Sequence, residues 1–247
     1  MKNTSVFKKS LSAVLAVSIL MSFFVLFANL KVNAATDRVS MYSTGLTFSK
    51  YGMSTREIFV QTNDSASDQH VYIHYNYMDG QDWRDEEATY VTTLSDGAKI
   101  WKATVTSYNL QYAIKYVADG QTFWDNNNNQ NYSSEEIGVA PIAVRRGSYP
   151  YTSYDNTYKI DVLLKNYGYE KNVQVRYTQD NWATYSDVPL SYSSTNSDGT
   201  ELWSVTLNLD DRGTSNFQYC VYYQVNGQTY WANYFGQNYD ALYYMYK

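Results

Sequence analysis

Cysteine, proline, histidine and charged residues are all scarce in this chain, and their scarcity excludes several classes of function. Cys220 is the single cysteine, so no disulfide can form within the chain. Only 17% of the residues are charged, and the net charge is −5 at pH 7. A protein that binds nucleic acid needs a basic surface. The composition therefore argues against a nucleic-acid partner and disfavours an anionic membrane.

Groups that could carry out catalysis are also few. A Ser-His-Asp triad would need His70 or His74, and no nucleophile elbow is present. No cysteine or carboxylate at ligand spacing joins these two histidines, which we interpret as surface residues. The acidic residues near Trp83 do not recur in the second half of the chain, as a repeated glycosidase site would require. The sequence predicts no catalytic residue, no metal site and no cofactor.

The N-terminus is typical of a targeting segment. Three lysines within residues 2–9 precede an apolar run over residues 11–30, and Val32-Asn33-Ala34 offers small residues at a cleavage site. This pattern predicts a signal peptide, 1–34, and an extracellular protein. The run approaches the length of a membrane span, so an uncleaved membrane anchor is the alternative.

Helical periodicity is almost absent after the N-terminal segment, and short alternating runs replace it. Residues 71–75, 173–177, 203–207 and 219–225 alternate apolar side chains with others, and Asp-Gly, Asn-Gly or Ser/Asn-rich turns bound them. Such short, evenly spaced strands predict an all-β fold of antiparallel sandwiches. Trp101 and Trp203 lie mid-strand in this alternation, and we expect both in the core.

What the chain does have is a repeat rich in aromatics and asparagine. Residues 119–132 read DGQTFWDNNNNQNY, and residues 226–239 read NGQTYWANYFGQNY. Upstream landmarks recur in the same order: a tryptophan (Trp83, Trp182), an Asp-Gly turn and a second tryptophan. Internal similarity of this kind predicts two copies of one module. We expect the modules at 36–140 and 148–247, with residues 133–150 as the connection.

The repeats resemble the family 21 carbohydrate-binding modules, which bind starch and glycogen. Copy two carries KNYGYEKNVQVR at 165–176, DNW at 180–182, Asp-Gly at 198–199 and the Asn-rich segment at 226–239. Copy one carries Asp-Trp at 82–83, Asp-Gly at 96–97 and WDNN at 124–127. The resemblance implies two immunoglobulin-like antiparallel β-sandwiches in tandem, each with up to two glucan sites. In copy two, Ala232 and Tyr234 depart from the Asp and Asn that the family usually has.

The resemblance also implies which residues bind sugar. One site per module pairs two tryptophans with asparagines of the Asn-rich loop; these residues are Trp83, Trp124, Asn126 and Asn128 in copy one and Trp182, Trp231 and Asn233 in copy two. A further site of copy two comprises Asn166, Tyr169, Lys171 and Tyr192. Copy one has neither an aromatic nor a lysine at the matching positions of this further site.

We therefore expect a secreted, non-catalytic protein whose partner is an α-1,4-glucan such as starch, amylopectin or glycogen. Separate amylases or the cell surface are further expected partners. Two alternatives remain. Family members also serve as glycogen-targeting regulatory subunits of a type 1 protein phosphatase, with an Arg-Val-x-Phe docking motif. This chain has Arg38-Val39-Ser40-Met41 instead, and an export signal would separate it from that partner. The other alternative is an accessory fragment of an α-glucan hydrolase.

Overall fold

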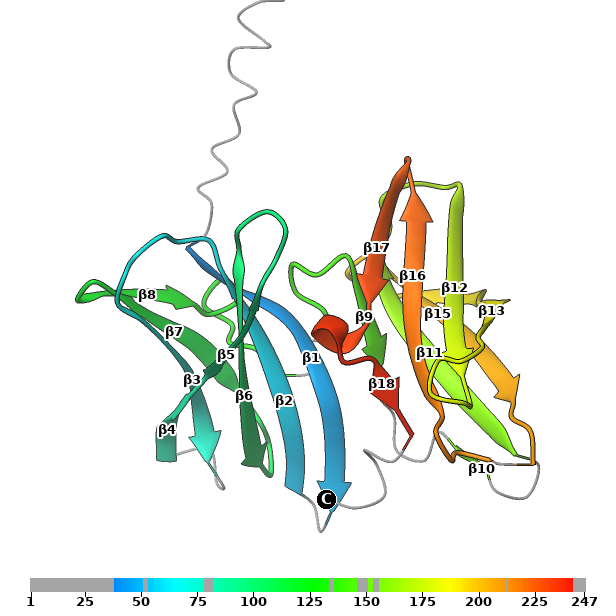
Figure 1. Ribbon diagram of the computed structural model, residues 1–247. Coiled ribbons are helices and arrows are strands. Elements are labelled where there is room, and N and C mark those ends of the chain that lie inside the picture. Colours follow the sequence, from blue (N-terminus) through cyan, green and yellow to red (C-terminus); the bar gives the residue numbers. More distant parts are fainter. Residues whose placement is uncertain are drawn as a thin grey trace, which may run out of the picture. The chain divides into compact units, whose positions relative to one another are not determined.

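A computed structural model describes residues 38–50, 53–77, 82–133, 136–145, 151–152, 156–211 and 213–241. In this part of the chain the regular elements are β-strands and one short 3-10 turn, η1 (Tyr234–Gly236), which confirms the all-β prediction (Figure 1). The predicted signal peptide lies outside the described residues. Within the described ranges, no helix is long and apolar enough to cross a membrane.

The first sandwich consists of two antiparallel four-stranded sheets. One sheet has the order β1-β2-β6-β5 and the other β4-β3-β7-β8. Their bounds are β1 (Val39–Lys50), β2 (Met53–Thr62), β3 (Gln69–Tyr77), β4 (Asp82–Glu87), β5 (Thr89–Thr93), β6 (Lys99–Ser107), β7 (Tyr112–Ala118) and β8 (Gln121–Asp125).

The second sandwich repeats this strand order. One sheet runs β10-β11-β15-β14, with β9 also paired to β11, and the other runs β13-β12-β16-β17, with β18 paired to β16. The bounds are β9 (Ile142–Arg145), β10 (Tyr151–Thr152), β11 (Thr157–Lys165), β12 (Lys171–Thr178), β13 (Ser186–Pro189), β14 (Ser191–Thr195), β15 (Thr200–Asn208), β16 (Gln218–Val225), β17 (Gln228–Ala232) and β18 (Tyr239–Asp240). Strand β9 falls in the segment expected to connect the repeats, yet it belongs to a sheet.

Each sandwich has its own apolar core between its two sheets. In the first, the core includes Ile58 and Val60 of β2 and Val71 and Ile73 of β3. In the second, the core includes residues of β11, β12 and β16, among them Val162, Val175 and Val221. Alternate residues of each strand point inward, because successive side chains leave opposite faces of a strand. The opposite faces of β3, β7, β12 and β16 are therefore free to carry polar and aromatic groups.

The two mid-strand tryptophans are half-buried at the margin of these cores, which corrects the expectation that both are core residues. The indole nitrogen explains the difference, since a buried N–H needs an acceptor. Trp101 Nε1 donates to Thr62 Oγ1 at 3.0 Å, and Trp203 Nε1 donates to Glu201 Oε2 at 2.8 Å. A tyrosine lies edge-on to each indole, Tyr90 in the first sandwich and Tyr192 in the second.

Candidate functional site

Trp182 and Trp231 come together in the second sandwich, although 49 positions separate them in the sequence. Both line an open pocket of about 420 Å³, whose other lining residues are Arg176, Tyr185, Cys220, Asn233 and Asn238. Trp231 projects from β17 and is 45% exposed, and its ring centroid lies 5.0 Å from that of Tyr222. The pocket thus presents a broad aromatic face to solvent.

The turn between β12 and β13 fixes Trp182 in an unusual backbone conformation. Its φ is 68°, a left-handed value that is rare for a large aromatic residue. Two hydrogen bonds hold it: its main-chain N–H donates to Thr178 Oγ1 at 3.0 Å, and its Nε1 donates to Gln218 Oε1 at 2.7 Å. Strained residues persist only where their surroundings determine them, and they cluster at functional sites. This geometry favours a functional position for the Trp182 ring.

A paired arginine and aspartate lie beside these rings, and the sequence analysis did not identify them. Arg176 donates to both carboxylate oxygens of Asp187, at 2.8 and 2.7 Å. Its guanidinium lies 4.3 Å from the ring centre of Tyr185 and 5.8 Å from that of Trp231. These hydrogen bonds lower the pKa of Asp187 and raise that of Arg176, so both groups are charged at neutral pH. The pair presents fixed polar atoms between aromatic rings.

One signal in the sequence could have found Arg176. It alternates with Val173, Val175 and Tyr177, which places it on the outer face of β12. By contrast, Cys220 behaves as expected of a buried residue. Burial raises the pKa of its thiol to about 11, so it contributes apolar surface rather than a reactive thiolate.

Asn233 begins the loop that follows Trp231. Its Oδ1 accepts the main-chain N–H of Gly236 at 3.2 Å, and its carbonyl accepts the N–H of Asn238 at 2.8 Å. Asn126 does the same in the first sandwich, where it accepts from Asn129 at 3.0 Å and from Asn131 at 2.9 Å. The Asn-rich segment is thus one loop structure used twice. Asn128 sits in it with a φ of 56° and is exposed.

In the first sandwich, Trp83 and Trp124 converge on a histidine. The His74 ring stacks on Trp83 with centroids 5.0 Å apart, and Trp124 lies edge-on to it at 5.5 Å. His74 and Arg176 occupy the same place, because His74 is opposite Asp85 in the β3–β4 register as Arg176 is opposite Asp187 in β12–β13. The structure therefore brings both predicted tryptophan pairs together around a basic residue.

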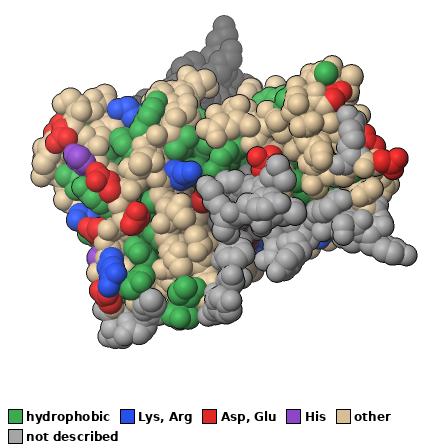
Figure 2. Space-filling model, turned by 60° about the horizontal axis from the view of Figure 1, so that its bottom comes forward, with side chains coloured by type: hydrophobic (Ala, Val, Ile, Leu, Met, Phe, Trp, Pro, Cys, Tyr) green, Lys and Arg blue, Asp and Glu red, His purple; other side chains and the backbone are tan. Residues whose placement is uncertain are grey.

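The face around this histidine is more charged than its counterpart. Asp85 accepts from His74 Nδ1 at 2.6 Å and from Lys115 Nζ at 2.8 Å. Burial opposes ionisation of Asp85, but these hydrogen bonds outweigh it and lower the carboxyl pKa. Lys115 occupies the position that Tyr222 has in the second sandwich, opposite the exposed tryptophan. Acidic, basic and histidine side chains are interspersed on the first sandwich in Figure 2.

The further site predicted in copy two is not assembled as the resemblance implied. The Lys171 side chain is only 5% exposed, and its Nζ lies 2.8 Å from Glu201 Oε2, itself 8% exposed. The same ammonium donates to Asn166 Oδ1 at 2.7 Å. The Lys171 ammonium is thus part of a buried ion pair and does not face a ligand. It could influence ligand binding only by orienting Asn166, whose side chain it contacts.

The two tyrosines of that further site lie in different surroundings. Tyr169 is 93% exposed in the loop before β12. Tyr192 is exposed on β14, where its hydroxyl and that of Thr195 are 2.9 Å apart and its ring is nearly perpendicular to that of Trp203. Tyr167, which the sequence analysis did not single out, anchors the loop through Tyr223, whose hydroxyl oxygen accepts its N–H at 3.2 Å.

Comparison with known families gives a match to the carbohydrate/starch-binding module (family 21) over residues 153–241. The match spans the second repeat, the part of the chain that holds the Trp182–Trp231 pocket. It confirms the resemblance for that repeat, and the tandem arrangement stays a prediction.

Curated relatives match a similar length of chain. Protein phosphatase 1 regulatory subunit 3C of Bos taurus is 34% identical over 90 residues, which cover 35% of this chain and 28% of the relative. Protein phosphatase 1 regulatory subunit 3B of Homo sapiens is 35% identical over 85 residues, covering 33% and 30%. The chain thus spans less than a third of these relatives. The prediction of a non-catalytic protein agrees with both comparisons, because the family is a binding module and the relatives are regulatory subunits.

Two solved structures are similar at low identity. They are the carbohydrate-binding module of the muscle glycogen-targeting subunit of Protein Phosphatase-1 (23% identity, TM-score 0.34, 40% of this chain and 73% of the other) and the starch-binding domain of Rhizopus oryzae glucoamylase (22%, 0.33, 42% and 93%). Residues 153–241, the segment that holds the tryptophan pocket, are thus similar in sequence to the carbohydrate/starch-binding module (family 21).

Proposed function

We propose that the second sandwich binds α-glucan chains at the pocket formed by Trp182, Trp231 and Asn233. The observation that carries this proposal is the convergence of two tryptophans and the Asn-rich loop at one open pocket, within the segment that matches a starch-binding family. The module acts by binding polysaccharide, without a reaction of its own.

The chemistry of the pocket suits a neutral sugar. The axial C–H groups of a glucose ring form an apolar face, which can stack on the exposed indole of Trp231. Sugar hydroxyls need polar partners at the margin of that face, and ligand sites provide a few fixed ones. The amide of Asn233 and the Arg176–Asp187 pair stand at this margin. The low overall charge excludes strong attraction to an acidic polysaccharide.

We further propose that the first sandwich is a second, immunoglobulin-like module of the same kind. Support comes from equivalent positions in the two sandwiches. Trp124 is opposite Lys115 of β7 as Trp231 is opposite Tyr222 of β16, and the loops after the two tryptophans have the same hydrogen-bond pattern. Its partner would again be α-glucan, but the ion pairs around His74 and Asp85 make its face more polar. We expect its affinity to differ from that of the second sandwich.

An affinity gel tests the proposed function directly. The full chain should be retarded by amylopectin and glycogen and should migrate normally with cellulose and xylan, because the segment that holds the pocket matches a starch-binding family. Retardation should change by less than about twofold between low and high salt, since stacking releases no counterions. It should also survive a chelator. Equal retardation by cellulose, or loss of binding in EDTA, would contradict the proposal.

A regulatory subunit of a protein phosphatase is the second candidate, and the names of the curated relatives favour it. One structural observation bears on it: Val39 and Met41 of the Arg38–Met41 tetrapeptide are 3% and 1% exposed in β1, so this segment is not free to dock.

The two candidate functions require different cellular compartments. We propose export, and protein recovered from culture supernatant should begin at Ala35. A full-length chain that stays in the cell and co-purifies with a type 1 phosphatase would establish the second candidate instead.

A further inference from the structure

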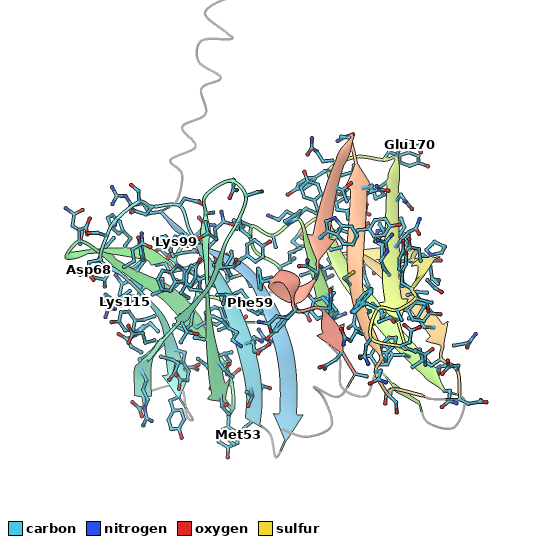
Figure 3. The ribbon with its side chains drawn as sticks, in the orientation of Figure 1. Met53, Phe59, Asp68, Lys99, Lys115 and Glu170 are labelled. Atoms are coloured by element: carbon cyan, nitrogen blue, oxygen red, sulfur yellow. The ribbon has the colours of Figure 1, made fainter. Side chains whose placement is uncertain are left out.

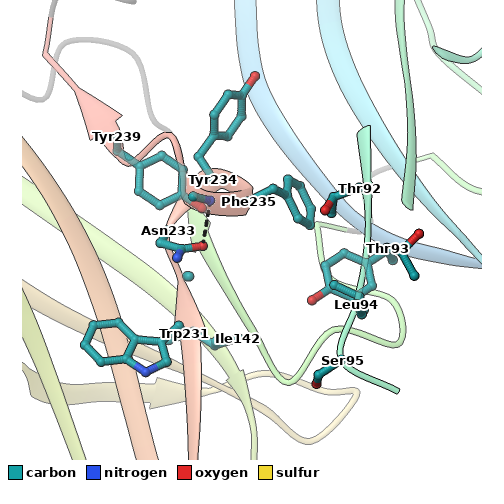
Figure 4. Close-up of a pocket in the computed structure, with 13 residues that line it drawn as sticks. Thr92, Thr93, Leu94, Ser95, Ile142, Trp231, Asn233, Tyr234, Phe235 and Tyr239 are labelled. Carbon is teal, nitrogen blue, oxygen red and sulfur yellow. Dashed lines mark hydrogen bonds between the residues drawn. The ribbon is translucent and has the colours of Figure 1, made fainter. Parts of the chain in front are cut away.

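A second cleft adjoins the tryptophan pocket, and both sandwiches line it. Its volume is about 300 Å³. From the second sandwich it takes Trp231, Asn233 and the η1 turn, and from the first it takes Tyr42 and the end of the β5 hairpin, residues 92–95. Figure 4 shows Trp231 and Asn233 on one side of this cleft and Thr92 to Ser95 across from them.

The cleft shares two lining residues with the proposed glucan pocket. Trp231 and Asn233 line both spaces, so the two lie next to each other at these residues. A chain that lies on the Trp231 ring and is longer than the pocket can therefore continue into the cleft. A short oligosaccharide that fills the pocket would not reach the cleft.

Side chains of the η1 turn, in the second sandwich, contact the first sandwich beside the cleft. The Phe235 ring packs 5.0 Å from Phe59 and 5.8 Å from Tyr42, measured between centroids. The Tyr234 hydroxyl donates to Glu57 Oε1 at 3.1 Å, and the Lys102 ammonium lies 5.9 Å from its ring centre. Phe59 is seen beside this turn in Figure 3. The position of the β5 hairpin across from Trp231 thus rests on side-chain packing.

The same contacts explain why the second copy departs from the Asn-rich sequence of the first. Tyr234 and Phe235 have φ values of 49° and 56°, close to those of Asn127 and Asn128 at the matching loop positions. Asparagine tolerates this left-handed conformation well, whereas large aromatic residues are rare in it. Two consecutive aromatics in such a conformation therefore need a compensating interaction. Packing on the first sandwich supplies it.

The walls of the cleft carry groups that recognise neutral hydroxyls. Thr92, Thr93 and Ser95 bring side-chain hydroxyls from the hairpin, and Thr93 and Ser95 are exposed. Tyr42 adds a phenol. Burial, together with nearby Asp96 and Tyr167, raises its pKa, so the phenol keeps its proton at neutral pH and can donate a hydrogen bond. Together with the Trp231 face, these groups suit another stretch of the same glucan.

We propose that the glucan-binding groove of the second sandwich extends into this cleft, and that the hairpin of residues 92–95 in the first sandwich supplies its outer subsites. This inference rests on the proposed function. It names a longer α-glucan chain as the ligand and makes the complete site depend on both sandwiches.

A matched pair of variants tests the extension. Ser95 and Ser197 hold the same place in equivalent turns, because Gly97 N–H donates to the Leu94 carbonyl as Gly199 N–H donates to that of Asn196. Ser95 lines the cleft, whereas Ser197 is exposed in a turn of the second sandwich. Ser95→Trp should fill the cleft, and Ser197→Trp serves as the control. Both are made in a Trp124→Ala chain, which removes the exposed tryptophan of the first sandwich.

Calorimetry with maltotriose and maltoheptaose gives the readout. Ser95→Trp should weaken maltoheptaose binding by about tenfold and leave maltotriose unchanged, because only the longer chain reaches the outer subsites. Ser197→Trp should change neither. Unchanged maltoheptaose binding by Ser95→Trp, or equal losses for both sugars, would overturn the extension while the proposed function stands. If the parent chain binds neither sugar, the proposed function itself fails. Ser95→Arg, paired with Ser197→Arg, repeats the test if the tryptophan variant does not fold.

Discussion

Trp231→Ala should weaken binding of soluble amylopectin by about 1–3 kcal/mol, roughly 5- to 150-fold, the range of a binding hot spot. The ring is 45% exposed and lies at the junction of the pocket and the cleft, so its loss removes the stacking face for a glucan. The melting temperature should change little, because Trp231 lies outside the core of the second sandwich and packs on the ring of Tyr222 at the surface. Isothermal titration and a thermal melt measure the two quantities.

Trp203→Ala is the matched control for this result. Trp203 is half-buried against the second core and donates to Glu201, so its loss should lower stability by more than 1 kcal/mol. Glucan binding by the molecules that remain folded should not change. If Trp231→Ala unfolds the second sandwich, or if it binds amylopectin as tightly as the parent chain, the assignment of Trp231 to the binding face is wrong.

Lys171→Ala should destabilise the second sandwich by about 3–5 kcal/mol, because it leaves the Glu201 carboxylate buried without its ammonium partner. Both side chains of this pair are less than 10% exposed, and Glu201 also accepts from the Trp203 indole. Urea unfolding monitored by tryptophan fluorescence measures the loss. A Lys171→Ala chain as stable as the parent, with glucan affinity reduced, would return Lys171 to the direct sugar contact that the resemblance implied.

The first sandwich offers a rescue variant for this experiment. Gln69 and Lys99 hold the positions of Lys171 and Glu201, as the strand registers show, and Lys99 Nζ donates to Gln69 Oε1 at 2.9 Å. In the first sandwich only Lys99, on β6, is charged, whereas in the second both Lys171 and Glu201 are charged. In the first sandwich Trp101 donates to Thr62, whose place in the second sandwich is taken by Leu164. A chain with Lys171→Gln, Glu201→Lys and Leu164→Thr, which keeps an acceptor for the Trp203 indole, should therefore recover part of the lost stability. No recovery would mean that burial of the pair is not the cause.

Much of the architecture follows from local sequence pattern. Alternation of period two in residues 71–75 and 173–177 reflects strands with one face on a core, and the structure places Val71, Ile73, Val173 and Val175 there. The recurrence of the Asn-rich segment likewise indicates a loop used twice. A loop of this kind depends on residues a few positions apart, as the bond between Asn126 and Asn129 illustrates.

Sequence pattern failed where a side chain meets a partner distant in the chain. Lys171 matches a sugar-binding motif in its local sequence, but its partner Glu201 lies 30 residues away on another sheet. Trp101 and Trp203 lie in the alternating pattern of core residues. Their indole nitrogens nevertheless donate to polar acceptors, so both rings remain half-buried at the margin of the cores. Alternation specifies the face of a strand on which a residue lies. The depth of burial and the partner are set by the neighbouring strands.

The sequence by itself determined the all-β class, the recurrence of the Asn-rich loop and the positions of the paired tryptophans. Only the tertiary structure decided that Arg176 and Asp187 pair beside Trp231, that Lys171 is buried, and that Tyr234 and Phe235 pack on the first sandwich. The physical reason is the separation along the chain over which each kind of interaction acts. Strand periodicity and turn chemistry act over two to four residues, whereas Tyr234 meets Glu57 across 177 positions, and packing of the whole chain is required to bring such residues together.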